Sequence, residues 1–203
     1  MNITNVNSEI VHGDKIEAIF NRQKELMDKY HDIELRSGLL QTEDCPVNLN
    51  DKRGQARIKD FAWRVTEELG EALDAWKTGD VIHTKEELAD GLHFLTELSI
   101  LAGFPFTGAT LESIWKGTNS NAGVEEAVTD FIAKLGMTCN CLKNKPWKQS
   151  QMLTDVPEFN KRLYSTWLSY IGIMALIFHS VDEAVDIYFK KSNVNKFRQR
   201  SGY

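Results

Sequence analysis

The stretch A-R-I-K-D-F-A-W-R-V-T-E-E-L-G-E-A-L-D-A-W-K, residues 56–77, decides the fold. Its apolar side chains recur every three or four residues, which is the spacing of one face of an amphipathic helix. They are Ile58, Phe61, Val65, Leu69, Leu73 and Trp76. Gly79 follows, and glycine commonly stands just past a helix C-terminus. The stretch therefore predicts a long helix that buries one face against the rest of the chain.

Helical patterns continue on both sides of this stretch, and the alternation typical of strands is almost absent. Capping residues and apolar spacing predict further helices at residues 14–33, 84–102, 122–141, 155–178 and 180–190. No repeat or linker divides the chain. We therefore expect an all-α fold, a bundle of about six helices that forms a single domain over residues 1–203. The polar segment 191–203 is expected to be a loop or a frayed end.

Composition restricts the class of protein. The chain has 203 residues and a net charge of −5, which argues against a nucleic-acid partner because phosphate contacts need clustered Lys and Arg. Its three cysteines lack the paired spacing of a zinc site and fit a reducing compartment, so we expect a cytoplasmic protein. Residues 1–14 are polar, unlike a signal peptide. The apolar run 163–178 is shorter than the roughly 20 residues that span a bilayer. We interpret it as a buried core helix and expect no membrane partner.

Two pairs of acidic residues stand at helical spacing on neighbouring helices. Glu68 and Glu71 lie three residues apart beside the apolar stripe, and Glu87 and Asp90 repeat this spacing on the next helix. Residues three apart share a helix face, and the short turn around Gly79 favours antiparallel packing. Four converging carboxylates repel one another unless cations lie between them. An all-oxygen set suits Mg²⁺, with Mn²⁺ as a substitute.

The same residues have an ordinary structural explanation. Glutamate is a good helix former, and acidic residues near a helix start complement the helix dipole. Thr84 and Glu87 have capping-box spacing, so Glu87 can serve as part of a helix cap. Glu67, Glu86 and Glu97 are expected to be solvated surface acids of this kind. On spacing alone, surface carboxylates are commoner than a metal site.

Three segments change this balance: E-E-L-G-E-A-L-D-A-W-K (67–77), E-E-L-A-D-G-L-H-F (86–94) and K-S-N-V-N-K-F-R-Q-R-S-G-Y (191–203). Together they resemble the all-α nucleoside triphosphate pyrophosphatase superfamily, which includes MazG-like enzymes. The first two carry its E-x-x-E and E-x-x-D metal signature. The third is similar to the ending K-N-x-x-N-x-x-R-Q-x-x-G-Y of the dimeric dUTPase and phage dCTP pyrophosphatase branch, with Ser192 in place of the usual Asn.

The resemblance implies a set of site residues. The implied Mg²⁺ ligands are Glu68, Glu71, Glu87 and Asp90. The C-terminal segment would close over the substrate, and its implied contacts are Lys191, Asn195, Arg198, Gln199 and Tyr203. Arg offers phosphate a fork of donors and Lys a point charge. On the first helix, the resemblance makes Gln23 a candidate for recognising the base.

Other residues of the resembling segments have more ordinary expectations. The branch often has a longer W-K-x-W-K segment where this chain has only Trp76 and Lys77, so Lys77 is a less certain candidate for a phosphate contact. His93 is expected to be a packed residue or to support the site from behind, rather than to bind metal. Trp63 and Trp76 are expected to pack in the core.

The reaction that the resemblance implies is hydrolysis of a pyrimidine deoxynucleoside triphosphate to the monophosphate and pyrophosphate. Glu68 or Glu71 would accept the proton of the attacking water. We favour dUTP as the substrate. Phage members of the branch often cut dCTP, and nothing in the residues separates uracil from cytosine, so dCTP or a broader set of dNTPs stays open. A helical interaction protein, or one that senses nucleotide without cutting it, is the non-enzymatic alternative. The branch also implies a homodimer.

Overall fold

The computed structural model describes residues 6–8, 11–118 and 122–200, and this part of the chain contains seven helices and no strand. The helices are α1 (Lys15–Ser37), α2 (Lys52–Thr78), α3 (Val81–Leu101), α4 (Leu111–Gly117), α5 (Val124–Asn140), α6 (Val156–Ile177) and α7 (Val181–Arg200). The expected all-α fold is confirmed. The unexpected helix is α4, which is too short to show a clear apolar period but begins with a capping box between Thr110 and Ser113.

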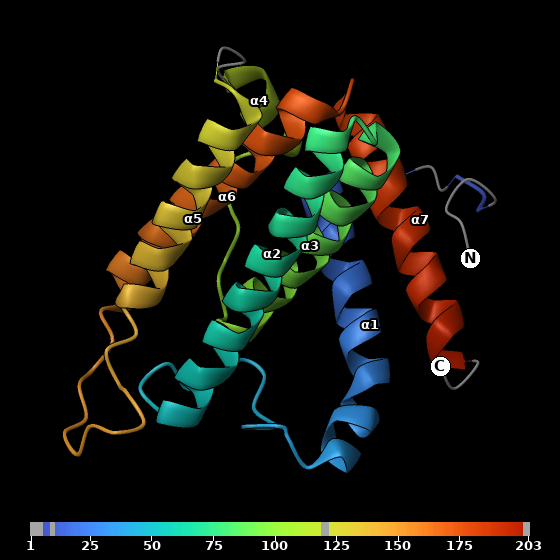
Figure 1. Cartoon of the computed structure of the whole chain (residues 1–203). Helices are drawn as coiled ribbons and strands as arrows, with labels where there is room; N and C mark the ends of the chain where they lie inside the picture. The colour runs from blue at the N-terminus through green and yellow to red at the C-terminus, as the bar shows by residue number, and fades with distance from the viewer. Residues whose placement is uncertain (1–5, 9–10, 119–121, 201–203) are drawn as a thin grey trace.

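Helices α2 and α3 form a hairpin and lie side by side (Figure 1). The side chain of Asp51 accepts hydrogen bonds from the backbone N–H groups of Arg53 and Gly54, so α2 begins at Lys52, earlier than expected. Gly79 ends α2 with a φ of 80°, a conformation that favours glycine. Asp80 then caps α3 by accepting from the His83 N–H.

The alternative in which Glu87 forms part of the cap of α3 is therefore wrong. Because Asp80 caps α3, Thr84 lies one turn inside the helix, where its hydroxyl donates to the Asp80 carbonyl. The Glu87 side chain does not cap the helix, and its Oε1 lies 3.1 Å from Nδ1 of His83.

Helix α7 corrects the expectation for the C-terminal segment. It continues as a helix to Arg200, although residues 191–203 were expected to be a loop or a frayed end. The polar residues there are held by α1: Arg22 donates to Asn193 over 3.1 Å, and Lys196 pairs with Glu25 at 2.7 Å. Val194 is buried among them. The spacing of apolar residues within one helix does not reveal such partners, because the partners lie on another helix.

The core includes residues of α2 and α3, and its largest fully buried side chains come from α5, α6 and α7. Fully buried members include Phe131, Phe159, Trp167, Tyr170 and Tyr188. The expected core helix at residues 163–178 is confirmed as most of α6. In the described part of the chain, no single helix is long and apolar enough to cross a membrane, and α6 with α7 pass that test only as a pair bent by 101°.

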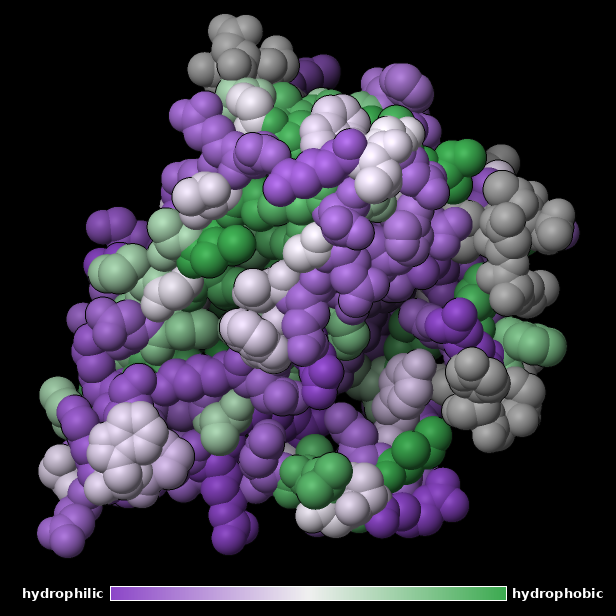
Figure 2. All heavy atoms as spheres, in the orientation of Figure 1, coloured by the Kyte–Doolittle hydropathy of each residue, from purple (hydrophilic) through white to green (hydrophobic). Residues whose placement is uncertain are grey.

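The two tryptophans of α2 were wrongly expected in the core. Trp63 is 60% exposed, and Trp76 is also exposed. Trp63 follows the buried Phe61 by two residues and so points about 200° away from it around the helix, while Trp76 lies in the last turn of α2 at the edge of the bundle. Figure 2 shows polar side chains over most of this face, with an apolar strip between α5 and α2.

Candidate active site

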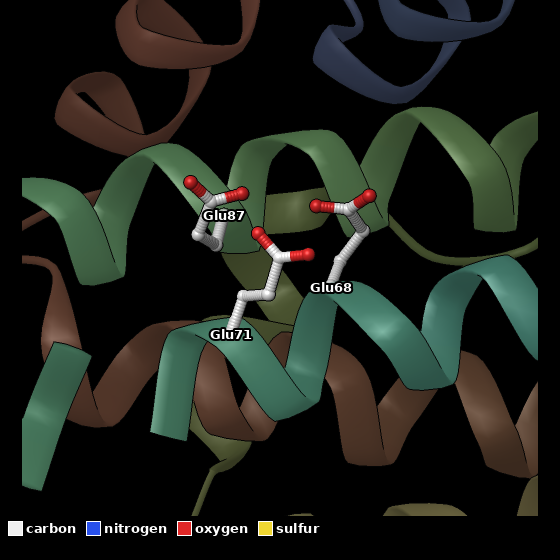
Figure 3. Close-up of side chains that lie close together, drawn as sticks. All are labelled: Glu68, Glu71 and Glu87. Atoms are coloured by element: carbon white, nitrogen blue, oxygen red, sulfur yellow. The ribbon is translucent and has the colours of Figure 1, made fainter. Parts of the chain in front are cut away.

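Three of the four acidic residues meet between α2 and α3. Glu68 and Glu71 project from α2 and Glu87 projects from α3, and one carboxylate oxygen of each lies within 4.8 Å of the others. Figure 3 shows the three side chains pointing toward one another from the two ribbons. The spacing of three residues and the hairpin together produce this convergence.

Asp90 lies one turn further along α3 and has a different partner. Its Oδ2 is 2.6 Å from the Nζ of Lys191 on α7, and this ammonium is also 3.8 Å from Glu86. Both Asp90 and Lys191 are largely shielded from solvent. The helical form of α7 is what places the lysine here, next to the acidic cluster.

The cluster is costly to ionise in the absence of a cation. Burial, hydrogen bonding with Glu87 and the charges of Asp90, Glu87 and Glu71 raise the pKa of Glu68 to about 8. Burial also raises the pKa of Asp90, against the opposing effect of Lys191. Carboxylates held together this way favour either a shared proton or a cation between them. Their oxygen-only chemistry fits a hard divalent metal ion.

A glycine allows α3 to approach its neighbours closely at this level. A Cβ on Gly91 would overlap the Tyr170 hydroxyl, and it would lie 3.3 Å from Tyr170 Cζ and 3.4 Å from Glu68 Cβ. The Tyr170 hydroxyl itself donates to the Leu88 carbonyl over 2.7 Å. Gly91 thus sets the distance between α3, α6 and the acidic face of α2.

A cavity of about 350 Å³ opens beside the cluster, bounded by α1, α2, α3 and α7. Its lining includes Gln23, Tyr30, Phe61, Glu68, Asp90, His93, Phe94, Glu97, Asn195 and Arg198. A larger cavity of about 780 Å³ lies against the first turns of α1 and residues 104–113. It does not include any of the four acidic residues, and its Asp14 is engaged in capping α1. We therefore regard the smaller cavity as the one joined to the chemistry.

Glu97 corrects another expectation. It was expected to be a solvated surface acid but is only 8% exposed, and burial raises its pKa to about 7. Glu97 stands one helical turn after His93 on α3, a helix buried on nearly all sides. The sequence did indicate this burial. Apolar residues occupy every face of that helix, so no face is left for a solvated acid.

Gln23, Glu97 and His93 form one buried polar group at the cavity. Gln23 Nε2 donates to Glu97 Oε2 over 2.8 Å, and Gln23 Oε1 lies 2.8 Å from His93 Nδ1. The Tyr188 hydroxyl also reaches Gln23 Oε1, at 3.3 Å, and the Tyr188 ring stacks on His93 with 4.0 Å between ring centroids. His93 is thus packed, as expected.

The other implied substrate contacts fall in different places. Lys191, Asn195 and Arg198 recur every three or four residues on α7, and the last two line the cavity. Lys77 pairs with Glu125 of α5 at 3.4 Å, and both are exposed. The Gln199 side chain and Tyr203 lie outside the described residues.

Comparison with known proteins supplies one match. A family model described as dUTPase matches residues 15–203, nearly the whole chain. Searches against curated proteins and against solved structures gave no match. The matched region includes all four acidic residues, the cavity and all of α7.

Proposed function

This chain belongs to the dUTPase family, and on that premise we propose that it hydrolyses dUTP to dUMP and pyrophosphate, using Mg²⁺ held by Glu68, Glu71, Glu87 and Asp90. The observation that carries the proposal is the convergence of Glu68, Glu71 and Glu87 beside a cavity of about 350 Å³. A nucleotide bound there would place its triphosphate at the carboxylates and its base in the cavity.

Different residues of the chain would carry out different steps of this reaction. When bound, Mg²⁺ supplies Lewis acidity and compensates the charge of phosphate and carboxylate. Glu68 is the favoured proton acceptor for the attacking water, because it belongs to the acidic cluster and also lines the cavity. Glu71 is the alternative acceptor. Lys191 and Arg198 would stabilise negative charge on the departing pyrophosphate, and Asn195 would contact phosphate or sugar.

One substrate panel tests the reaction and the base together. The protein is incubated with each dNTP and NTP in the presence of Mg²⁺, and pyrophosphate and orthophosphate are measured separately. We expect dUTP to give dUMP and pyrophosphate in equal amounts. Release of orthophosphate, or no turnover of any nucleotide, would contradict the proposal. A preference for dCTP would keep the reaction and change the base.

We further propose that the protein works as a homodimer in the cytoplasm, with a deoxynucleoside triphosphate as its partner and no nucleic acid. Three free cysteines support a reducing compartment. Light scattering coupled to gel filtration measures the mass in solution. A mass near 23.2 kDa would mean a monomer.

Metal binding is expected to release a proton from the acidic cluster. With its pKa raised to about 8, Glu68 holds a proton at pH 7 that a metal must displace, and it is mostly ionised at pH 9. Calorimetric titration with Mg²⁺ in buffers of different ionisation enthalpy should therefore give about one released proton at pH 7 and few at pH 9. Equal release at both values would contradict this assignment.

A further inference from the structure

The buried group formed by Glu97, Gln23 and His93 has a defined direction of hydrogen bonding. The Glu97 side chain is 8% exposed, His93 is 5% exposed and Gln23 is 3% exposed. Above its pKa of about 7, the Glu97 carboxylate is ionised and only accepts hydrogen bonds, so it takes the Nε2–H of Gln23. The amide can then face His93 only with its oxygen, Oε1.

This direction determines which nitrogen of His93 carries the hydrogen. Burial and the charge of Lys191 lower the pKa of His93 to about 3, against a hydrogen bond with the Tyr188 backbone that raises it, so the imidazole is neutral and has a single N–H. The oxygen of Gln23 accepts that hydrogen from Nδ1. Nε2 is left as an acceptor, and it is buried with no hydrogen-bond partner among the described residues.

A buried acceptor without a partner is costly, and a ligand that donates to it recovers the cost. His93 lines the cavity in which the base would bind. Uracil carries a hydrogen on N3, whereas N3 of cytosine carries a lone pair. An acceptor that meets N3 therefore attracts uracil and repels cytosine.

We propose that Glu97 is a positioning residue for base selection: through Gln23 it holds His93 in the form whose Nε2 accepts the N3–H of uracil. The inference rests on the proposed function, because it requires a pyrimidine nucleotide in this cavity. Stacking on Tyr188 keeps the imidazole ring in place, so the selection depends on the position of one hydrogen. An amide in place of the Glu97 carboxylate no longer fixes the orientation of Gln23. It can both donate and accept a hydrogen bond, so the Gln23 side-chain amide can flip and exchange the positions of Oε1 and Nε2.

The variant Glu97→Gln tests the inference with little change of shape. At pH 8.5, above the pKa of about 7 of Glu97, kcat/KM is measured for dUTP and dCTP on the same sample. We expect the dUTP to dCTP ratio to exceed 1 in the original protein and to fall by about tenfold in the variant. Loss of folded or active protein affects both substrates and cancels in the ratio. The matched control Glu25→Gln removes a charge two residues from Gln23, on a side chain that pairs with Lys196, and should keep the original ratio.

A second measurement does not depend on turnover. The ¹⁵N chemical shifts of labelled histidine in the full chain distinguish a nitrogen that carries hydrogen from one that does not, and His93→Gln identifies the signal. We expect Nδ1–H in the original protein and a shift toward Nε2–H in Glu97→Gln. Hydrogen on Nε2 of the original protein would overturn the inference.

The two proposals fail in distinguishable ways. If the original protein cuts no nucleotide, the proposed function is wrong, and the inference built on it falls as well. If it cuts dUTP but Glu97→Gln keeps the same dUTP to dCTP ratio, only the role of Glu97 is wrong. A preference of the original protein for dCTP also overturns the inference while leaving pyrophosphate release intact.

Discussion

Replacing Glu71 with Gln is expected to lower dUTP turnover by about 100-fold or more, and Asp90→Asn is expected to do the same. Each change keeps the size of the side chain but removes a negative charge from the proposed Mg²⁺ ligands. Steady-state pyrophosphate release under saturating Mg²⁺ measures the effect.

The same Glu71→Gln variant should fold at least as stably as the original protein. The charge of Glu71 is one of those that raise the pKa of Glu68, so its removal relieves repulsion within the metal-free cluster. Thermal unfolding in the presence of a chelator is therefore expected to give an equal or higher Tm. A large loss of activity without loss of stability is typical of a functional acid rather than a structural one.

A neighbouring acid provides the matched control. Glu67 stands next to Glu68 on α2, but its carboxylate accepts hydrogen bonds from Trp63 and Arg64 on the outside of the helix. Glu67→Gln should therefore retain turnover within about twofold, since surface changes away from a site have small effects. Wild-type rates in Glu71→Gln and Asp90→Asn would exclude the proposed metal site.

Replacing Gly91 with Ala is expected to reduce the free energy of unfolding by about 2 kcal/mol, as for other overpacked cores. The new methyl group would overlap the Tyr170 hydroxyl, and Tyr170 is fully buried and cannot swing aside. For a chain of this length, the change corresponds to a fall in Tm of roughly 4–8 °C. Denaturant and thermal unfolding measure it directly.

Two further variants show whether the contact is responsible. Gly136→Ala, in α5, adds a methyl group with nothing within 4 Å and should stabilise the helix by up to about 1 kcal/mol. Combining Gly91→Ala with Tyr170→Phe removes the overlapping hydroxyl and should recover part of the lost stability. An unchanged free energy of unfolding in Gly91→Ala would mean that α3 and α6 are not packed this closely.

The sequence by itself determined the helical class and the acidic face of the hairpin. Apolar residues every three or four positions in α2 report which side of that helix is buried, and Gly79 marks where the chain turns back. From these, the sequence predicted that both acidic pairs face one another, because residues three apart share a face. The structure brings Glu68, Glu71 and Glu87 together. The resemblance of the C-terminal segment to the dUTPase branch is supported by the family match.

Only the tertiary structure decided what the remaining site residues contact. Asp90 is paired with Lys191 because α7 remains helical beyond residue 190, held by polar partners on α1. Glu97 is buried because Gln23, 74 positions earlier, supplies its hydrogen bond. The spacing of apolar residues along a helix predicts which face of that helix is buried, and it does not predict what that face contacts. Which residues meet there depends on how separate helices pack, and a buried polar group is stable only where such packing supplies its partner.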